Sequence, residues 1–175
     1  MALTLLRHTT PEVAPGTCYG RTDLALAPSF EAEAAEVIAR LPEVAHVVSS
    51  PLTRCVRLAE RIAGVRGLRA RIEPLWTEMD FGRWEGVPWS ALPRDELDAW
   101  AADFYHARPH GGESVAELQA RVAEALARLP AEPVLVVTHM GTIKAALHLA
   151  GRAGAWDHTV PFGTAVPVPR QGSAQ

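Results

Sequence analysis

The chain has 175 residues, of which 48% are hydrophobic and 21% are charged, and its formal net charge is −3. This composition is typical of a globular domain with a buried core, and it excludes the disordered and fibrous classes. The negative net charge argues against a general nucleic-acid or membrane binder, so an anionic ligand must be held by local positive charge. The two cysteines, Cys18 and Cys55, form no CxxC pair and indicate neither a zinc site nor a disulfide framework.

The hydrophobic pattern and the first residues of the chain predict the cellular location of the protein. No apolar run approaches the ~20 residues that a membrane-spanning helix needs. The first residues lack a basic segment and a cleavage site, so we expect no signal peptide and a reduced, cytoplasmic setting. The length fits a single domain over residues 1–170, followed by a disordered tail at 171–175.

Short apolar runs alternate with helical patterns along the chain. The segment 9–29, rich in glycine and proline, and the segment 78–89, which contains glycine and aromatic residues, read as loops, and residues 109–112 break a helical pattern. Ser50 is the expected N-cap of one helix, with Pro51 at its first position. The expected strands cover residues 2–6, 44–48, 69–74 and 133–138, with a weaker signal at 164–168. The expected helices cover residues 30–41, 51–63, 94–106, 114–129 and 141–150.

This alternation of strands and helices predicts an α/β domain with a mostly parallel sheet. The apolar run from Val134 to Val137 has no polar alternation, which fits a strand buried on both faces. We therefore predict a three-layer α/β/α sandwich. A small helical cap is expected as an insertion at about residues 79–112, between the third strand and the long helix.

Three of the expected strands end in polar side chains. Ligands of parallel sheets bind beyond the carboxyl ends of the strands, so these side chains are expected to meet at one edge. Arg54 follows in the first turn of a helix near the same edge. This convergence predicts a functional site. The polar pairs are Arg7 with His8, Ser49 with Ser50, and Thr138 with His139.

Two histidines and two arginines at one edge suit a phosphate. The planar guanidinium matches phosphate oxygens, and nearby positive charge favours a neutral, nucleophilic imidazole at His8. Phosphoryl transfer mainly needs positioned donors, which Arg7, Arg54 and His139 can supply. An alkoxide leaving group also needs a proton from a carboxylic acid, and these considerations do not choose which one.

Five motifs stand in order and cover most of the chain: residues 6–11 (LRHTTP), 49–54 (SSPLTR), 78–86 (EMDFGRWEG), 111–114 (GGES) and 137–141 (VTHMG). In this order they resemble the histidine phosphatase superfamily, also called phosphoglycerate mutase-like. The resemblance implies a reaction without metal or cofactor. It implies His8 as the nucleophile and Glu78 as the acid and base. It also implies Arg7, Arg54 and His139 as phosphate ligands.

A narrower resemblance lies in residues 18–23 (CYGRTD), 79–86 (MDFGRWEG) and 97–100 (LDAW). These segments are similar to α-ribazole phosphatase, which implies removal of the 5′-phosphate of α-ribazole phosphate in cobalamin biosynthesis. A broad-specificity phosphomonoesterase is the alternative within the family. A phosphoglycerate mutase is less favoured, because the chain is short between Gly86 and Gly111. The competing class is a non-catalytic module that binds a phosphorylated ligand.

The expected partner is a small phosphate ester, not a nucleic acid or a membrane, and a homodimer stays open. We expect Thr17 and Arg21, in the loop that closes over the substrate, to contact the phosphate or the rest of the substrate. The usual family glycine after the histidine is replaced by Thr9, and threonine takes positive φ with difficulty, so this loop is expected to follow a different path.

Several residues have competing interpretations. Glu85 and Glu113 compete with Glu78 as the acid, but Glu113 is expected to order the 111–112 turn or to cap the following helix. A metal pair of His106 and His110 is not favoured, because Pro109 breaks their helical register. Aromatic residues of the cap either stack on an aromatic base or, for most of them, pack the cap onto the domain. They are Trp84, Trp89, Trp100, Phe104 and Tyr105.

Overall fold

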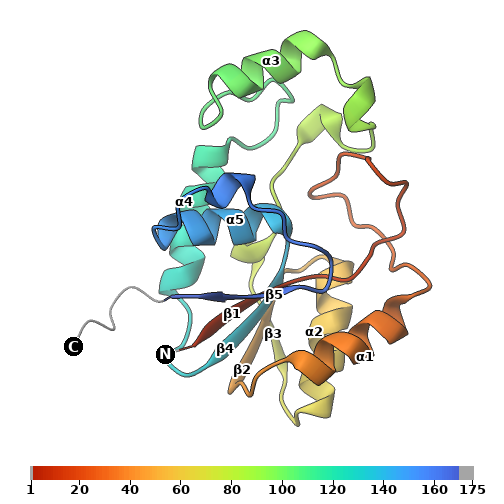
Figure 1. Ribbon diagram of the computed structural model, residues 1–175, viewed down its shortest axis with the longest axis vertical. Helices are drawn as coiled ribbons and strands as arrows, with labels where there is room; N and C mark the ends of the chain where they lie inside the picture. Colours follow the sequence, from red (N-terminus) through yellow and green to blue (C-terminus); the bar gives the residue numbers. More distant parts are fainter. Residues whose placement is uncertain (1, 170–175) are drawn as a thin grey trace.

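The computed structural model describes residues 2–169, so the tail expected at 171–175 lies outside the described residues. The strands are β1 (Leu3–Arg7), β2 (His46–Ser49), β3 (Ala70–Ile72), β4 (Val134–Thr138) and β5 (Ala165–Val168). The helices are α1 (Phe30–Arg40), α2 (Thr53–Val65), α3 (Arg94–Ala102), α4 (Val115–Ala127) and α5 (Met140–Leu149). The strands form one sheet in the order β3-β2-β4-β1-β5 (Figure 1), in which only β5, at the edge, pairs antiparallel among the described strands.

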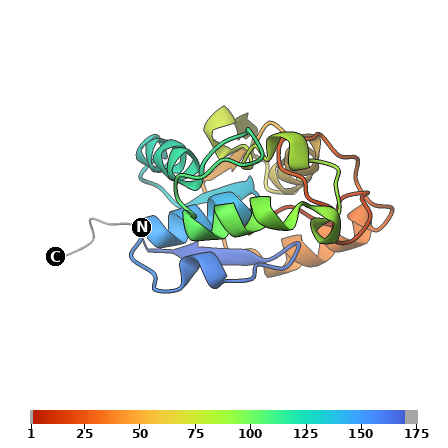
Figure 2. The same cartoon turned by 90° about the horizontal axis from the view of Figure 1, so that it is seen from above.

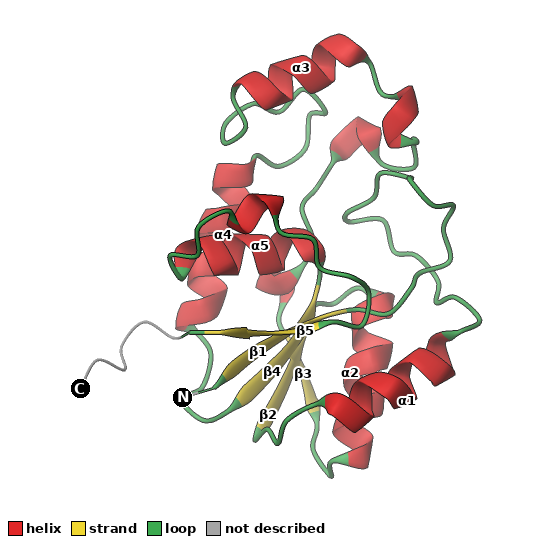
Figure 3. Ribbon diagram, viewed as in Figure 1, coloured by secondary structure: helices red, strands yellow, loops and turns green. Residues whose placement is uncertain are grey.

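Helices cover both faces of this sheet (Figure 3). Val134 and Val136 of β4 point into a core formed with α4 and α5. Leu135 and Val137 point into a second core formed with α1 and α2. A strand covered on both faces has no polar side, which explains its unbroken apolar sequence. The predicted α/β/α architecture is confirmed. Among residues 2–169, no helix has both the length and the apolar character needed to cross a membrane.

Helix α2 begins later than the sequence indicates. Its N-cap is Leu52, in extended backbone, so the prediction of Ser50 as the cap and Pro51 as the first helical residue was wrong. The Asp23 carboxylate, from the distant loop, accepts from the Thr53 backbone N–H at 2.8 Å and from its hydroxyl at 2.7 Å. This remote side chain takes the capping role, and local sequence rules cannot detect it.

Helices α3 and α4 are shorter than expected, and α4 spans Val115–Ala127 rather than 114–129. α3 stops at Ala102, short of the expected residue 106. α4 starts after Ser114, whose hydroxyl accepts from the Glu117 backbone N–H at 3.1 Å. The Glu117 carboxylate accepts in return from the Ser114 N–H at 2.7 Å, which completes a capping box. Ser114 rather than Glu113 is therefore the cap.

The segment 79–112, which contains α3, lies beyond the carboxyl ends of the strands, and α3 crosses above α5 when seen from the top (Figure 2). The loop 9–29 is bound to this segment by backbone hydrogen bonds. The Cys18 N–H donates to the Val87 carbonyl at 2.8 Å, and the Cys18 carbonyl accepts from the Gly86 N–H at 2.8 Å. The Trp89 N–H donates to the Gly16 carbonyl at 2.9 Å. We call residues 16–18 and 86–89 the loop–cap ladder.

Candidate active site

The register of the sheet brings the two motif histidines together. β1 and β4 pair Arg7 with Thr138, so the residue that follows each strand is a histidine. The backbone N–H of His8 continues the ladder by donating to the Thr138 carbonyl at 3.0 Å. The rings of His8 and His139 lie with their centroids 5.2 Å apart. The predicted convergence at this edge therefore follows directly from strand pairing.

His8 is buried and its imidazole has a defined orientation. Its Nδ1 lies 2.7 Å from the carbonyl oxygen of Thr9, which can only accept, so the proton must sit on Nδ1 and Nε2 carries the lone pair. Burial, followed by the charges of Arg54 and Arg7, lowers the pKa of His8 to about 3. The imidazole is therefore neutral near pH 7.

Thr9, which follows His8, does not have a positive φ, so its side chain does not strain the loop.

Two arginines lie near His8, and each has a buried N–H group without a hydrogen-bond acceptor among the described residues. Arg54 is fully buried and donates to the carbonyl of Thr22 at 2.8 Å and to that of Gly20 at 2.6 Å. The Arg7 guanidinium carbon lies 3.9 Å from the centre of the Phe162 ring. In both arginines, the Nε–H is buried without a partner among the described residues. Since buried donors are normally satisfied, these arginines fit a site for an anion.

His139 is buried next to His8. Its Nε2 lies 2.8 Å from the Ser50 hydroxyl and 3.5 Å from the Cys55 sulfur. Burial, followed by the charges of His8 and Arg54, lowers the pKa of His139 well below its ordinary value. This histidine is therefore also neutral, and its ring is fixed between α2 and β4.

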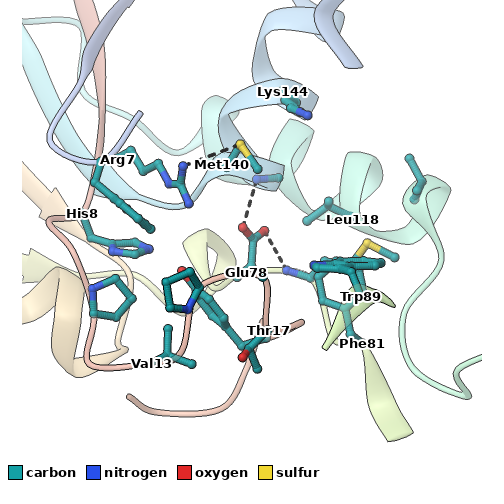
Figure 4. Close-up of a pocket in the computed structure, with 18 of the residues that line it drawn as sticks. Arg7, His8, Val13, Thr17, Glu78, Phe81, Trp89, Leu118, Met140 and Lys144 are labelled. Carbon is teal, nitrogen blue, oxygen red and sulfur yellow. Dashed lines mark hydrogen bonds between the residues drawn. The ribbon is translucent and has the colours of Figure 1, made fainter. Parts of the chain in front are cut away.

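Glu78 shares a cavity with His8 and Arg7. Its carboxylate accepts from the backbone N–H of Met79 at 2.9 Å and from that of Gly141 at 2.9 Å (Figure 4). A Cβ at position 141 would lie 2.4 Å from Glu78 Oε1, so only glycine allows this approach of the helix to the acid. The start of α5 thus holds the carboxylate in place.

The two competing glutamates are engaged elsewhere. The Glu85 carboxylate accepts from the backbone N–H groups of Arg21 and Thr22 at 2.8 and 2.7 Å. The Glu113 carboxylate lies 2.8 Å from the Arg121 guanidinium. Neither lines the cavity, whereas Glu78 does. The geometry therefore favours Glu78 among the three.

The cavity has a volume of about 540 Å³ and opens between the loop 9–29, the segment 79–112 and α5. Of the residues proposed from sequence, Arg7, His8, Glu78 and Thr17 line it, whereas Arg54 and His139 are buried and are not among its lining residues. Aromatic side chains form much of its wall. They are Tyr19, Phe81, Trp89, Trp100, Phe104, Trp156 and Phe162.

The aromatic residues of the cap pack against one another, and some of them also line the cavity. Trp84 is buried, its indole N–H donates to Glu96 at 2.7 Å, and its ring centre lies 5.7 Å from that of Trp100. Trp100 also reaches the cavity, as do Trp89 and Phe104. These three therefore combine packing with a place where a ligand can be contacted.

Arg21 is not brought to the cavity. Its side chain is 47% exposed, and the nearest carboxylate is that of Glu113 at 3.9 Å. Its role as a substrate contact stays a prediction.

Several lining residues were not singled out from the sequence, and Tyr19, Lys144, Trp156 and Phe162 are among them. Tyr19 lies with its ring centre 5.3 Å from the Arg54 guanidinium carbon, and its only signal was its place inside the CYGRTD segment. Trp156 and Phe162 belong to the stretch after Gly151, where no pattern was clear. Lys144 lies on the apolar helix α5 and carried no motif signal.

His110 is occupied in the cap. It is buried, and its Nδ1 accepts from the backbone N–H of Gly112 at 2.9 Å. Within residues 2–169, no three or more side chains of histidine, cysteine, aspartate or glutamate are grouped so that they could hold a metal ion.

The burial of His8 predicts how stability depends on pH. In the unfolded chain the imidazole gains a proton near pH 6.5, whereas in the folded protein it does so only near pH 3. Between these values the unfolded state binds more protons, so the free energy of unfolding must fall as the pH is lowered. At 1.36 kcal/mol per pH unit, His8 should account for a loss of about 2 kcal/mol between pH 6.5 and pH 5.

Urea denaturation at pH 7 and pH 5 measures this effect. His8→Ala should make the free energy of unfolding less dependent on pH than it is in the wild type. Val47→Ala is the matched control, because it also truncates a buried side chain but removes no titratable group, so it should leave the wild-type dependence unchanged. The same pH dependence in His8→Ala and wild type would contradict a buried neutral His8.

Comparisons with known proteins agree with this geometry. The profile of the Histidine phosphatase superfamily (branch 1) matches residues 3–161. The glucosyl-3-phosphoglycerate phosphatase of Mycobacterium tuberculosis is 30% identical, with 82% of this chain and 72% of that protein covered. The Bifunctional protein Rv2228c of M. tuberculosis is 38% identical over 129 residues. That match covers 70% of this chain and 35% of Rv2228c, so the chain spans about a third of that relative's length.

Solved structures give the same result. A structure described as phosphoglycerate mutase from Thermus thermophilus has a TM-score of 0.76 and 35% identity, with 96% of this chain and 92% of that chain covered. The mycobacterial glucosyl-3-phosphoglycerate phosphatase Rv2419c has a TM-score of 0.77 and 25% identity, with 95% and 88% covered. From the fold, the site and these matches, the chain belongs to the histidine phosphatase superfamily, a family with phosphatase and mutase activities.

Proposed function

We propose that the protein is a phosphomonoesterase that acts through a phosphohistidine intermediate. Nε2 of His8 attacks phosphorus, the bond from phosphorus to the ester oxygen breaks, and Glu78 gives its proton to the departing oxygen. Water then attacks the phosphohistidine while Glu78 takes a proton from it, which releases phosphate and restores His8. One observation carries this proposal: a neutral, oriented histidine and a fixed carboxylate line the same cavity.

The arginines and His139 are the proposed ligands of the phosphoryl group. Arg7 and Arg54 keep unpaired N–H groups beside His8, and guanidinium donors match the equatorial phosphoryl oxygens. His139 is proposed as a ligand because its ring lies beside that of His8, with the centroids 5.2 Å apart. Thr17 is proposed as a contact from the loop, since it lines the cavity.

The proposed substrate is α-ribazole 5′-phosphate. The benzimidazole of α-ribazole is flat and apolar, which suits the aromatic wall of the cavity. The rings of Trp89 and Trp100 are nearly parallel, at 17°, with centroids 6.3 Å apart, and both line the cavity. The local similarity of residues 18–23 and 97–100 supports the same choice.

A glycerate-type substrate is the second candidate. Relatives of this chain are described as a glucosyl-3-phosphoglycerate phosphatase and a phosphoglycerate mutase. A glycerate ester carries a carboxylate near its phosphate, and the cavity offers Lys144 as a cation besides Arg7. The broad-specificity esterase and the non-catalytic module remain as outcomes of the test.

Phosphate release from four esters in the presence of EDTA tests this choice. They are α-ribazole 5′-phosphate, glucosyl-3-phosphoglycerate, 3-phosphoglycerate and p-nitrophenyl phosphate. We expect kcat/KM for α-ribazole 5′-phosphate to exceed the others by at least about tenfold, which corresponds to 1.4 kcal/mol of selective binding.

Each other result has a definite meaning. A preference for glucosyl-3-phosphoglycerate would replace α-ribazole phosphate with the second candidate. Similar values for all four would indicate a general phosphomonoesterase. If no ester is hydrolysed while phosphate still raises the melting temperature, the protein is a binding module.

A further inference from the structure

Lys144 is the only lysine in the chain. The other residues among the 17 lysines and arginines are all arginine. It is half-buried on α5, and it lines the same cavity as His8 and Glu78. An ammonium is a compact charge with three donors and lacks the planar fork with which arginine binds phosphate in a bidentate manner. The one departure from arginine therefore occurs inside the candidate active site.

The position of Lys144 follows from the geometry of α5. Gly141, in the first turn, donates to the Glu78 carboxylate, and Lys144 comes three residues later. Residues three apart on a helix lie on the same side. Figure 4 shows Lys144 on this helix beyond Met140, away from the loop that carries Val13 and Thr17. Glu78 is the proposed proton donor to the ester oxygen, so Lys144 borders the space of the leaving group.

Lys144 is also without a direct partner. Its ammonium has no hydrogen bond and no ion pair within residues 2–169, although the charges of Glu78 and Asp157 favour its protonated form. Burial, the largest effect, lowers its pKa, and the charge of Arg7 acts in the same direction. A half-buried, unpaired ammonium beside apolar walls is unfavourable until an acceptor meets it. A ligand that supplies an oxygen here would satisfy it.

We propose that Lys144 is a specificity-determining residue that donates a hydrogen bond to an oxygen of the leaving group, close to the ester linkage. The inference rests on the proposed phosphomonoesterase function and adds a requirement to it. A ribose oxygen and a glycerate carboxylate share the necessary chemistry, since both are acceptors a few bonds from the phosphate. The leaving group selected by this enzyme therefore carries an acceptor oxygen as well as apolar surface.

Kinetics of Lys144→Met and Lys144→Arg on three esters test the proposal. Phenyl phosphate offers no acceptor oxygen on its leaving group, ribose 5-phosphate offers neutral oxygens, and 3-phosphoglycerate offers a carboxylate. We define the selectivity ratio as kcat/KM for ribose 5-phosphate divided by kcat/KM for phenyl phosphate. We expect Lys144→Met to lower this ratio by about tenfold. Lys144→Arg should recover part of this ratio. A larger fall with 3-phosphoglycerate than with ribose 5-phosphate would identify a carboxylate as the acceptor.

The main rival explanation is an effect exerted through Glu78. In that case Lys144→Met would lower kcat/KM for butyl phosphate, an alkyl ester without an acceptor oxygen on its leaving group, as much as for ribose 5-phosphate, because both leaving groups need a proton. Equal losses on these two alkyl esters would overturn the proposal, whereas we expect the loss on ribose 5-phosphate to be about tenfold larger. Wild-type protein that hydrolyses none of these esters would instead contradict the proposed function.

A binding measurement separates these failures, because it does not need turnover. Reductive methylation with ¹³C-formaldehyde labels the single lysine, and Lys144→Met identifies its NMR signal beside that of the amino terminus. In the His8→Ala background we expect saturating ribose 5-phosphate to shift the Lys144 signal more than saturating phenyl phosphate does. Equal shifts with the two esters would overturn the proposal.

Discussion

His8→Ala should lower kcat for p-nitrophenyl phosphate by at least about 10³-fold, because the attacking nitrogen is removed and no neighbour replaces it. His139 is the nearest other imidazole, but its Nε2 is held by Ser50 and it does not line the cavity. The substitution trims a buried ring without leaving a buried charge, so the protein should remain folded. Steady-state kinetics together with circular dichroism measure both parts.

A trapping experiment completes this prediction. Wild-type protein quenched in alkali during turnover of a ³²P-labelled ester should carry label, and His8→Ala should carry none. His158→Ala is the control, since His158 is half-buried outside the cavity and should keep both turnover and labelling. Normal turnover by His8→Ala at matched purity would refute the mechanism.

Glu78→Gln should slow alkyl esters by about 10²- to 10⁴-fold, the usual contribution of a general acid. The loss for p-nitrophenyl phosphate should be much smaller, because p-nitrophenolate leaves without a proton. Glutamine keeps the size of the side chain and retains one acceptor for the Gly141 N–H. The measurement is kcat/KM, which does not include hydrolysis of the shared phosphohistidine, for a series of esters with leaving groups of decreasing acidity, compared between wild type and variant.

Glu113→Gln provides the contrast. Its carboxylate binds Arg121 and does not face the cavity, so this variant should lower stability without a selective loss on alkyl esters. Equal losses on all esters in Glu78→Gln would argue against Glu78 as the acid. A selective loss in Glu113→Gln would transfer that role to Glu113.

The sheet and the reactive centre were predictable because they depend on short-range patterns. Strand ends at Arg7 and Thr138 were visible as apolar runs that stop at polar residues, and parallel pairing then places His8 next to His139. The acid was harder, since three glutamates had similar settings. The structure favours Glu78 through its contact with Gly141, a residue 63 positions away.

Features that depend on distant segments were missed. The cap of α2 is Asp23, which lies 30 residues before Thr53, so the local Ser50-Pro51 pattern was misleading. Trp156 and Phe162 reach the cavity from a stretch of turns that has no periodicity. Lys144 looked like an ordinary helix residue, because a sequence does not show which side of a helix faces a cavity.

The loop–cap ladder limits how the cap can be exchanged between related proteins. The loop residues 16–18 of this ladder are followed directly by Tyr19 and Gly20. The Gly20 carbonyl accepts a hydrogen bond from the Arg54 guanidinium. A Cβ at Gly20 would lie 1.8 Å from the Met79 carbonyl oxygen, so this connection tolerates little displacement. We therefore expect a cap transplanted from a relative without its matching loop to displace the Arg54 guanidinium, so that the cap and the position of this arginine change together.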